Sequence, residues 1–143
     1  MTHSISAKKK LLEDFLEQVW SNGDMSNVES FVAAEYTIRH DPGDPWEKQA
    51  LSIVGFKDRV EKSRAMAPDQ TFYVVSMIEE EESVAVSWTW TGTHLGDIPG
   101  IGITGRSIKM SGLTIYDFHD GKLSGHWQIA DRLSVYQQIN QPS

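Results

Sequence analysis

The sequence predicts an α+β fold, a cone of about three helices packed on a strongly curved antiparallel sheet that encloses a pocket. Apolar residues recur at helical spacing in the first half of the chain, and from Gln70 onward they follow the alternation typical of strands. Helices followed by consecutive antiparallel strands place the helices on one face of the sheet. A chain of 143 residues is long enough for one core, so we expect a single domain over residues 1–143.

The helices are predicted by apolar stripes that end at stop signals. A long first helix is predicted over 6–20, and the Ser-Asn-Gly-Asp run that follows supplies its stop. A short helix is predicted over 25–34, and a third helix over 50–67 ends at a proline. Between these two, 35–40 has the pattern of a brief strand, and the loop 41–45 contains two prolines that forbid regular pairing.

Strands are predicted through most of the second half of the chain. Two β-rich runs flank an acidic turn at 79–83, and the second run, 84–94, alternates between two faces. One face of that run carries Val84, Val86, Trp88 and Trp90. Continuing the period brings His94 to the same face, and the glycine-rich segment 95–105 then forms a loop.

The last two strands are joined by a tight turn at Asp120-Gly121. Both central positions of a type I′ turn need positive φ, which Asp tolerates and Gly adopts freely, so this dipeptide pairs 107–119 with 123–130. Strict alternation along the second strand puts His126 at the sheet surface or at a subunit contact. The opposite, inward side then carries Leu123, Trp127, Ile129 and Asp131.

Asp131 is the most suggestive residue of this strand. Burying an ionised carboxylate is unfavourable unless it finds a donor, so an acid in line with two apolar residues indicates a functional group. The alternative is that the strand has ended and that Asp131 caps a helix beginning at Arg132, because Asp is a preferred N-cap. The sequence leaves both interpretations open.

Composition excludes several classes of function. The net charge of −7 and the pI near 5.1 oppose nucleic-acid binding. The chain has no cysteine, no paired histidines at metal-binding spacing and no nucleotide-binding glycine motif, so we expect neither a metal nor a cofactor. It also lacks an apolar run of membrane-spanning length and a secretory signal, so we expect no membrane segment and a cytoplasmic location.

We expect the pocket to contain Asp131 as a base and His94 as its assistant. A carboxylate beside an imidazole that donates or accepts a proton suits general acid–base chemistry. The alternative for His94 is a histidine at the entry of a loop, hydrogen-bonded to the backbone. The other residues expected to line the pocket are His40, Trp46, Trp88, Trp90, Arg106 and Trp127.

A set of short motifs covers nearly the whole chain. It comprises Asn22-Gly23-Asp24, His40 before a proline-rich loop, Ala67-Pro68-Asp69, the run from Trp88 to Gly96, Thr104-Gly105-Arg106, and Asp120-Gly121-Lys122 followed by Trp127 and Asp131. In combination these motifs resemble the SnoaL-like polyketide (ester) cyclase family, of the nuclear transport factor 2-like superfamily. The resemblance implies a cystatin-like α+β cone, commonly a homodimer or higher homo-oligomer formed through the sheet, with an apolar pocket and no cofactor.

The resemblance also implies chemistry. In the characterised cyclases, an aspartate at the position that matches Asp131 is the acid/base of an aldol ring closure, and the histidine that matches His94 lies nearby. We therefore expect acid–base chemistry on a small hydrophobic carbonyl compound. The alternatives are a dehydratase, isomerase or epoxide hydrolase with the same pocket, a non-catalytic binding module, and an interaction domain that uses its exposed sheet.

Overall fold

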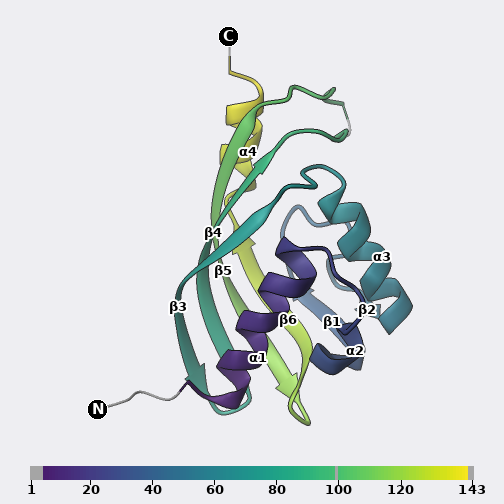
Figure 1. The fold of residues 1–143 in the computed structure, drawn as a ribbon, viewed down its shortest axis with the longest axis vertical. Helices are drawn as coiled ribbons and strands as arrows, with labels where there is room; N and C mark the ends of the chain where they lie inside the picture. The colour runs from purple at the N-terminus through teal and green to yellow at the C-terminus, as the bar shows by residue number, and fades with distance from the viewer. Residues whose placement is uncertain (1–4, 99, 142–143) are drawn as a thin grey trace.

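The computed structural model describes residues 5–98 and 100–141, and it confirms the α+β class. Six strands form one curved, open sheet in the order β2-β1-β6-β5-β4-β3. The helices α1, α2 and α3 lie against one side of this sheet, and α4 lies at one end of it (Figure 1). None of the helices in these two ranges is both long and apolar enough to cross a membrane.

Two of the helices begin at serine side-chain caps. Ser6 accepts a hydrogen bond from the amide of Lys9, and Ser52 accepts one from the amide of Gly55. The predicted first helix changes to a π-helical segment, η1, for its last turn and a half, and the predicted second helix ends early because its last residues join a strand. The bounds are α1 (Ala7–Phe15), η1 (Leu16–Ser21), α2 (Val28–Phe31), α3 (Ile53–Arg64) and α4 (Arg132–Ile139).

The strands form a sheet that is antiparallel apart from one pair. That exception is the pair β1/β6, which runs parallel and brings residues 32–40 beside residues 122–130. The predicted strand 35–40 begins earlier than expected, and the start of the predicted third helix is instead the short strand β2. The bounds are β1 (Val32–His40), β2 (Ala50–Leu51), β3 (Thr71–Glu80), β4 (Ser83–Thr93), β5 (Ser107–His119) and β6 (Lys122–Ala130).

A β-bulge at Ser124 changes which face of β6 points inward. Asp117 pairs with Gly125 and Phe118 pairs with Leu123, so Ser124 has no opposite residue. One extra residue reverses the alternation of every side chain that follows it. His126 is therefore buried, at 3% exposure, and its expected place at the sheet surface is wrong.

The same bulge overturns the expected inward position of three other residues, one of which, Ile129, is 45% exposed. Trp127 is half-buried on the outer side of the sheet, and Asp131 is exposed beyond the end of β6. The expectation for β4 is confirmed, because no bulge interrupts its pairing with β5 and both Trp88 and Trp90 are buried. Strict alternation was thus a sound assumption for one strand and failed for the other.

The core lies between α1, η1, α3 and the concave face of the sheet. Its centre is aromatic, with Phe15 in contact with Phe31, Phe56 and Tyr116 at centroid separations of 6.0–6.1 Å. Tyr36 meets Phe56 edge-on at 4.9 Å. Each of these pairs adds about 0.5–1.5 kcal/mol beyond its buried area. Aromatic contacts therefore stabilise the centre of the core.

Gly125 allows β1 and β6 to approach closely. A Cβ atom at this position would lie 2.4 Å from the backbone oxygen of Thr37, which is fixed in β1. We expect Gly125→Ala to lower the free energy of unfolding by about 1–3 kcal/mol, the usual cost of overpacking. Urea denaturation measures this, with Gly102→Ala as the control because a Cβ at Gly102 meets nothing within 4 Å. Equal stability of the two variants would contradict the close approach.

Candidate functional site

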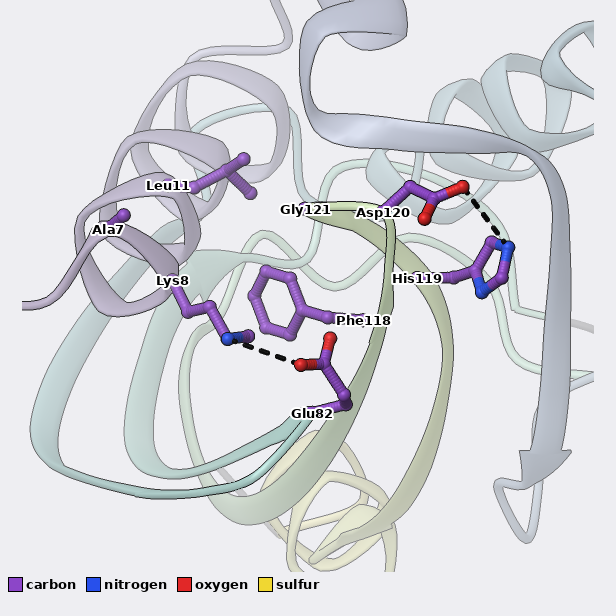
Figure 2. Close-up of a pocket in the computed structure, with 8 residues that line it drawn as sticks. All are labelled: Ala7, Lys8, Leu11, Glu82, Phe118, His119, Asp120 and Gly121. Carbon is purple, nitrogen blue, oxygen red and sulfur yellow. Dashed lines mark ion pairs between the residues drawn. The ribbon is translucent and has the colours of Figure 1, made fainter.

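One hollow of the molecule lies outside the cone, between the start of α1 and the tips of two hairpins (Figure 2). It has a volume of about 610 Å³, and its polar groups are at the surface. Lys8 pairs with Glu82 across 3.6 Å, and the side chains of His119 and Asp120 are 78% and 90% exposed. No buried polar group of the described chain converges on this hollow, so we do not place the site there.

A second cavity, of about 520 Å³, lies inside the cone and has the features of a binding site. Much of its wall is apolar and comes from η1, the loop after β1, the segment after α3, and the strands β3, β4 and β5. The apolar lining includes Trp20, Trp46, Met66, Phe72, Trp88, Trp90 and Met110. Polar side chains also line it, and six of them, which we call the polar wall, are Tyr36, Arg59, Tyr116, His126, Gln128 and Arg132.

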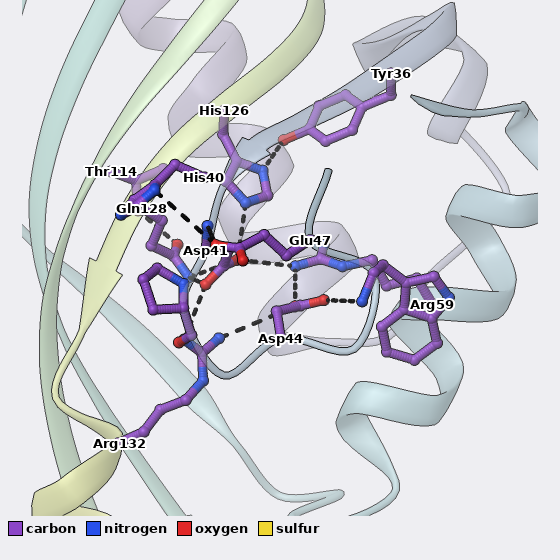
Figure 3. A network of polar contacts seen from close by, with 12 residues as sticks. Tyr36, His40, Asp41, Asp44, Glu47, Arg59, Thr114, His126, Gln128 and Arg132 are labelled. Carbon is purple, nitrogen blue, oxygen red and sulfur yellow. Dashed lines mark hydrogen bonds and ion pairs between the residues drawn. The ribbon is translucent and has the colours of Figure 1, made fainter. Parts of the chain in front are cut away.

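Asp41, the first residue after β1, lies behind the polar wall and is the centre of the polar network there (Figure 3). Its side chain is completely buried, and four other side chains form hydrogen bonds or ion pairs with its carboxylate. His126 Nε2 lies 2.9 Å from Oδ2, and Arg132 lies 2.8 Å from Oδ1. Two further partners are the Gln128 amide at 3.2–3.3 Å and the Arg59 guanidinium at 3.4 Å. Every lone pair of the buried carboxylate is thus engaged.

The charge state of Asp41 follows from these partners. Burial by itself raises the pKa of Asp41, but the hydrogen bond from His126 and the positive charges of Arg132 and Arg59 outweigh it, so the net pKa is lowered. Burial has the opposite effect on His126, whose pKa is lowered although Asp41 counters part of the shift. The pair is therefore a carboxylate hydrogen-bonded to a neutral imidazole.

This charge state fixes the direction of a proton relay. An ionised carboxylate only accepts, so the Nε2 of His126 carries the ring proton and its Nδ1 is an acceptor. Nδ1 lies 2.6 Å from the hydroxyl of Tyr36, which must donate. Burial raises the pKa of Tyr36 well above its ordinary value, so this donor is a neutral phenol. The relay runs from Tyr36 through His126 to Asp41.

A second set of hydrogen bonds runs from Asp41 across the sheet. Gln128 donates to Asp41 and accepts from the hydroxyl of Thr114 at 2.7 Å, and Thr114 accepts from the indole nitrogen of Trp88 at 2.9 Å. Trp88 fits here because Gly112 lies opposite, where a Cβ would be 2.3 Å from its ring. The apolar wall and the polar wall are therefore joined by one network.

Arg59 and Asp44 shape the loop that closes the site. Arg59 is 4% exposed, donates to Asp44 at 2.7 Å, and lies 5.3 Å from the ring centroid of Trp20. Asp44 also accepts from the amide of Trp46, which turns the loop so that Trp46 lines the cavity. The proline-rich loop after β1 is thus held by charge rather than by strand pairing.

The structure brings some of the expected pocket residues together and separates others. Trp46, Trp88 and Trp90 line the cavity. His40 and Trp127 do not, because they stack on one another at 4.7 Å on the outer side of the sheet. Arg106 also lies elsewhere, since it donates to the carbonyl of Gln138 near the end of α4.

The two residues expected to be catalytic do not line the cavity. Asp131 is exposed and accepts a hydrogen bond from the amide of Ser134 at 3.1 Å, which is the helix-cap geometry. His94 is buried, and its Nδ1 lies 2.8 Å from the hydroxyl and 3.3 Å from the amide of Thr104. Asp131 thus has the geometry of a helix cap, and His94 that of a histidine at the entry of a loop, which are the alternatives that the sequence left open.

Comparison with known proteins agrees with this α+β cone. The model of the family described as SnoaL-like polyketide cyclase matches residues 10–139, so the chain belongs to the SnoaL-like polyketide cyclase family. A candidate polyketide cyclase from Acidithiobacillus ferrooxidans is similar over 100% of both chains, with 46% identity and a TM-score of 0.92. The search of curated proteins finds no match.

Two more distant structures share the fold. TsrD from Streptomyces laurentii has 23% identity and a TM-score of 0.80, over 97% of this chain and 98% of its own. IdmH from Streptomyces antibioticus, a candidate polyketide cyclase, has 22% identity and a TM-score of 0.79, over 94% of this chain and 99% of its own. At this level of identity the likeness concerns the fold alone.

The buried pair Asp41–His126 makes stability depend on pH. The unfolded chain protonates His126 below about pH 6.5 and the folded protein only at lower pH, so the free energy of unfolding should fall as the pH drops from 6.5 toward the lowered folded pKa. The slope is at most about 1.4 kcal/mol per pH unit for one proton. The stability that Asp41 contributes is complete above its unfolded pKa of 3.8 and is lost as the pH falls through the lowered folded value.

Urea denaturation between about pH 8 and pH 5 measures the histidine part. His126→Gln should remove this slope, whereas His119→Gln, at an exposed position, should keep it. A wild-type slope that survives in His126→Gln would show that the buried imidazole is not its source.

Proposed function

We propose that this chain is a cofactor-independent enzyme that performs acid–base ring closure on a small hydrophobic carbonyl compound. The observation that carries the proposal is the buried relay Tyr36–His126–Asp41, which ends at the wall of an apolar cavity. The family match and the similar candidate cyclase support the reaction class. The relay takes the place of Asp131 and His94, which lie outside the cavity lining.

The relay moves a proton without a cofactor. An acidic C–H between two carbonyl groups gives its proton to the oxygen of Tyr36 as the Tyr36 hydroxyl proton passes to Nδ1 of His126. The products of this step are an enolate and an imidazolium. The enolate carbon then attacks another carbonyl group, which lies further along the same molecule. The relay returns the proton to the new alkoxide oxygen. Protons and electrons balance over the cycle, and His126 ends neutral.

Asp41 makes the intermediate state accessible. Its Oδ2 lies 2.9 Å from Nε2 of His126, so the imidazolium forms beside a carboxylate that is already ionised and oriented. Arg59 and Arg132 hold that carboxylate in place and keep its own proton affinity low. The proton therefore stops at His126, from which it can be returned. Positioned acid–base groups of this kind contribute about 10²–10⁴-fold to a rate.

A second candidate function is a non-catalytic binding module of the same fold. The observation in its favour is that both ring nitrogens of His126 already have protein partners. In that case the network is structural, and the aromatic wall holds a ligand without changing it. Proton exchange at the acidic carbon of a bound ligand separates the two candidates, because a binding module would not accelerate it.

The test uses 1-(2-naphthyl)butane-1,3-dione, whose acidic carbon exchanges its protons in D₂O at a rate that NMR measures. We expect the wild-type protein to accelerate exchange, and we expect Tyr36→Phe to lower the acceleration by about 10²–10⁴-fold because it interrupts the relay. Asp131→Asn is the matched control and should leave exchange unchanged, since Asn caps a helix nearly as well as Asp.

The melting temperature of each variant accompanies the measurement. Binding of the diketone without faster exchange would favour the binding module. Loss of exchange in a folded Asp131→Asn variant would return the base role to Asp131.

We also propose that the protein is a homodimer that buries the outer face of the sheet. This face presents Tyr73, Leu113 and Ile129 at 53%, 44% and 45% exposure, on neighbouring strands. Apolar side chains gathered on an open sheet face are a liability in water.

Light scattering tests the dimer. We expect twice the chain mass of 16.1 kDa at tens of micromolar, and the single-chain mass for the double variant Leu113→Lys, Ile129→Lys. Val54→Lys is the control, because Val54 is 78% exposed on α3, away from this face. A wild-type protein of single-chain mass would rule out the proposed dimer.

A further inference from the structure

Ring closure needs two acts, removal of a proton and stabilisation of the enolate oxygen that forms. The relay removes the proton, but it offers no group that stabilises the enolate oxygen. The Tyr36 hydroxyl donates to His126, and Gln128 donates to Asp41. Both of these donors therefore already have acceptors within the protein. A donor for the substrate must come from another side chain of the cavity wall.

Tyr116 lies next to the relay because of strand pairing. It is directly opposite His126 in the β5/β6 ladder, so both side chains project from the same face. Their ring centroids are 6.0 Å apart, and the Tyr116 ring also packs against Phe15 at 6.1 Å and 80°. The ring is thus clamped between the core and the relay, and it lines the cavity.

The hydroxyl of Tyr116 is available. Within residues 5–98 and 100–141 it forms no hydrogen bond. The buried side-chain nitrogen and oxygen atoms that lack a partner there are Arg59 Nε and His94 Nε2, so the Tyr116 oxygen, which is not one of them, is accessible from the cavity that the residue lines. The ring itself is 6% exposed, so the hydroxyl meets the cavity rather than the bulk solvent. Burial raises the pKa of Tyr116, so the group keeps its proton and can donate it in a hydrogen bond.

We propose that the Tyr116 hydroxyl is the catalytic hydrogen-bond donor that receives the carbonyl oxygen of the substrate beside His126. This inference rests on the proposed function, because it assumes a carbonyl ligand in the cavity. The donor holds the reacting carbonyl with its acidic carbon toward Tyr36, and its hydrogen bond strengthens as negative charge develops on the oxygen. Removal of one such donor typically lowers a rate about 10²–10³-fold.

The infrared absorption of a bound carbonyl group tests the hydrogen bond without any turnover. The probe is 2-acetonaphthone labelled with ¹³C at its carbonyl carbon, and quenching of tryptophan fluorescence reports its binding. We expect the carbonyl band of the bound probe to lie at lower frequency than in an apolar solvent, and to return toward the apolar position in Tyr116→Phe. Tyr73→Phe makes the same chemical change at an exposed position of the outer face and should leave the band unshifted from wild type.

A second variant covers the case in which Tyr116→Phe does not fold. Replacement of Tyr116 by 3-fluorotyrosine keeps the hydroxyl and makes it a stronger donor, so it should shift the band further to low frequency. A bound probe with an apolar-solvent frequency in the wild-type protein, or a probe that does not quench tryptophan fluorescence, would overturn the inference. Proton exchange of the diketone is measured separately, so a shifted band without exchange would reject the proposed reaction and keep Tyr116 as a binding donor.

Discussion

A buried negative charge at Asp41 is the constraint on which the rest of the site depends. An ionised carboxylate in a protein interior requires partners for its lone pairs, and removal of one partner of such a buried pair costs about 3–5 kcal/mol. The partners come from three separate elements: His126 and Gln128 from β6, Arg59 from α3 and Arg132 from α4. The charge therefore ties the last strand, the last helix and the middle helix to the end of β1.

The bulge at Ser124 decides which chemistry reaches the cavity. Without it, regular alternation would bring Trp127 and Ile129 inward and place His126 outside. With it, His126 and Gln128 meet Asp41, and Trp127 stacks with His40 on the outer side. One extra residue in a strand thus converts an apolar wall into a polar one.

Asp131 contributes to this arrangement from outside the cavity. Its side chain caps α4, and the first residue of that helix is Arg132. Arg132 in turn donates to Asp41 and to the carbonyl of Pro42, with Gly43 leaving room for its side chain. A capped helix holds its first turn in place, so Asp131 positions a partner of the buried carboxylate. The cap and the site are coupled through a single neighbouring residue.

Periodicity by itself determined the class of fold, the approximate positions of the three helices in the first half, the strands of the second half and the inward tryptophans Trp88 and Trp90, because these depend on local spacing. It could not determine the site. A bulge leaves no sequence signal at Ser124, so the orientation of His126 and Asp131 could not be read from alternation. Asp41 lies in a proline-rich loop that resembles any irregular segment, and its partners are 18 to 91 residues away along the chain. Only the packing of β1 beside β6 and of α3 and α4 around them brings these charges together, since the energy of a buried charge depends on distances that sequence spacing does not specify.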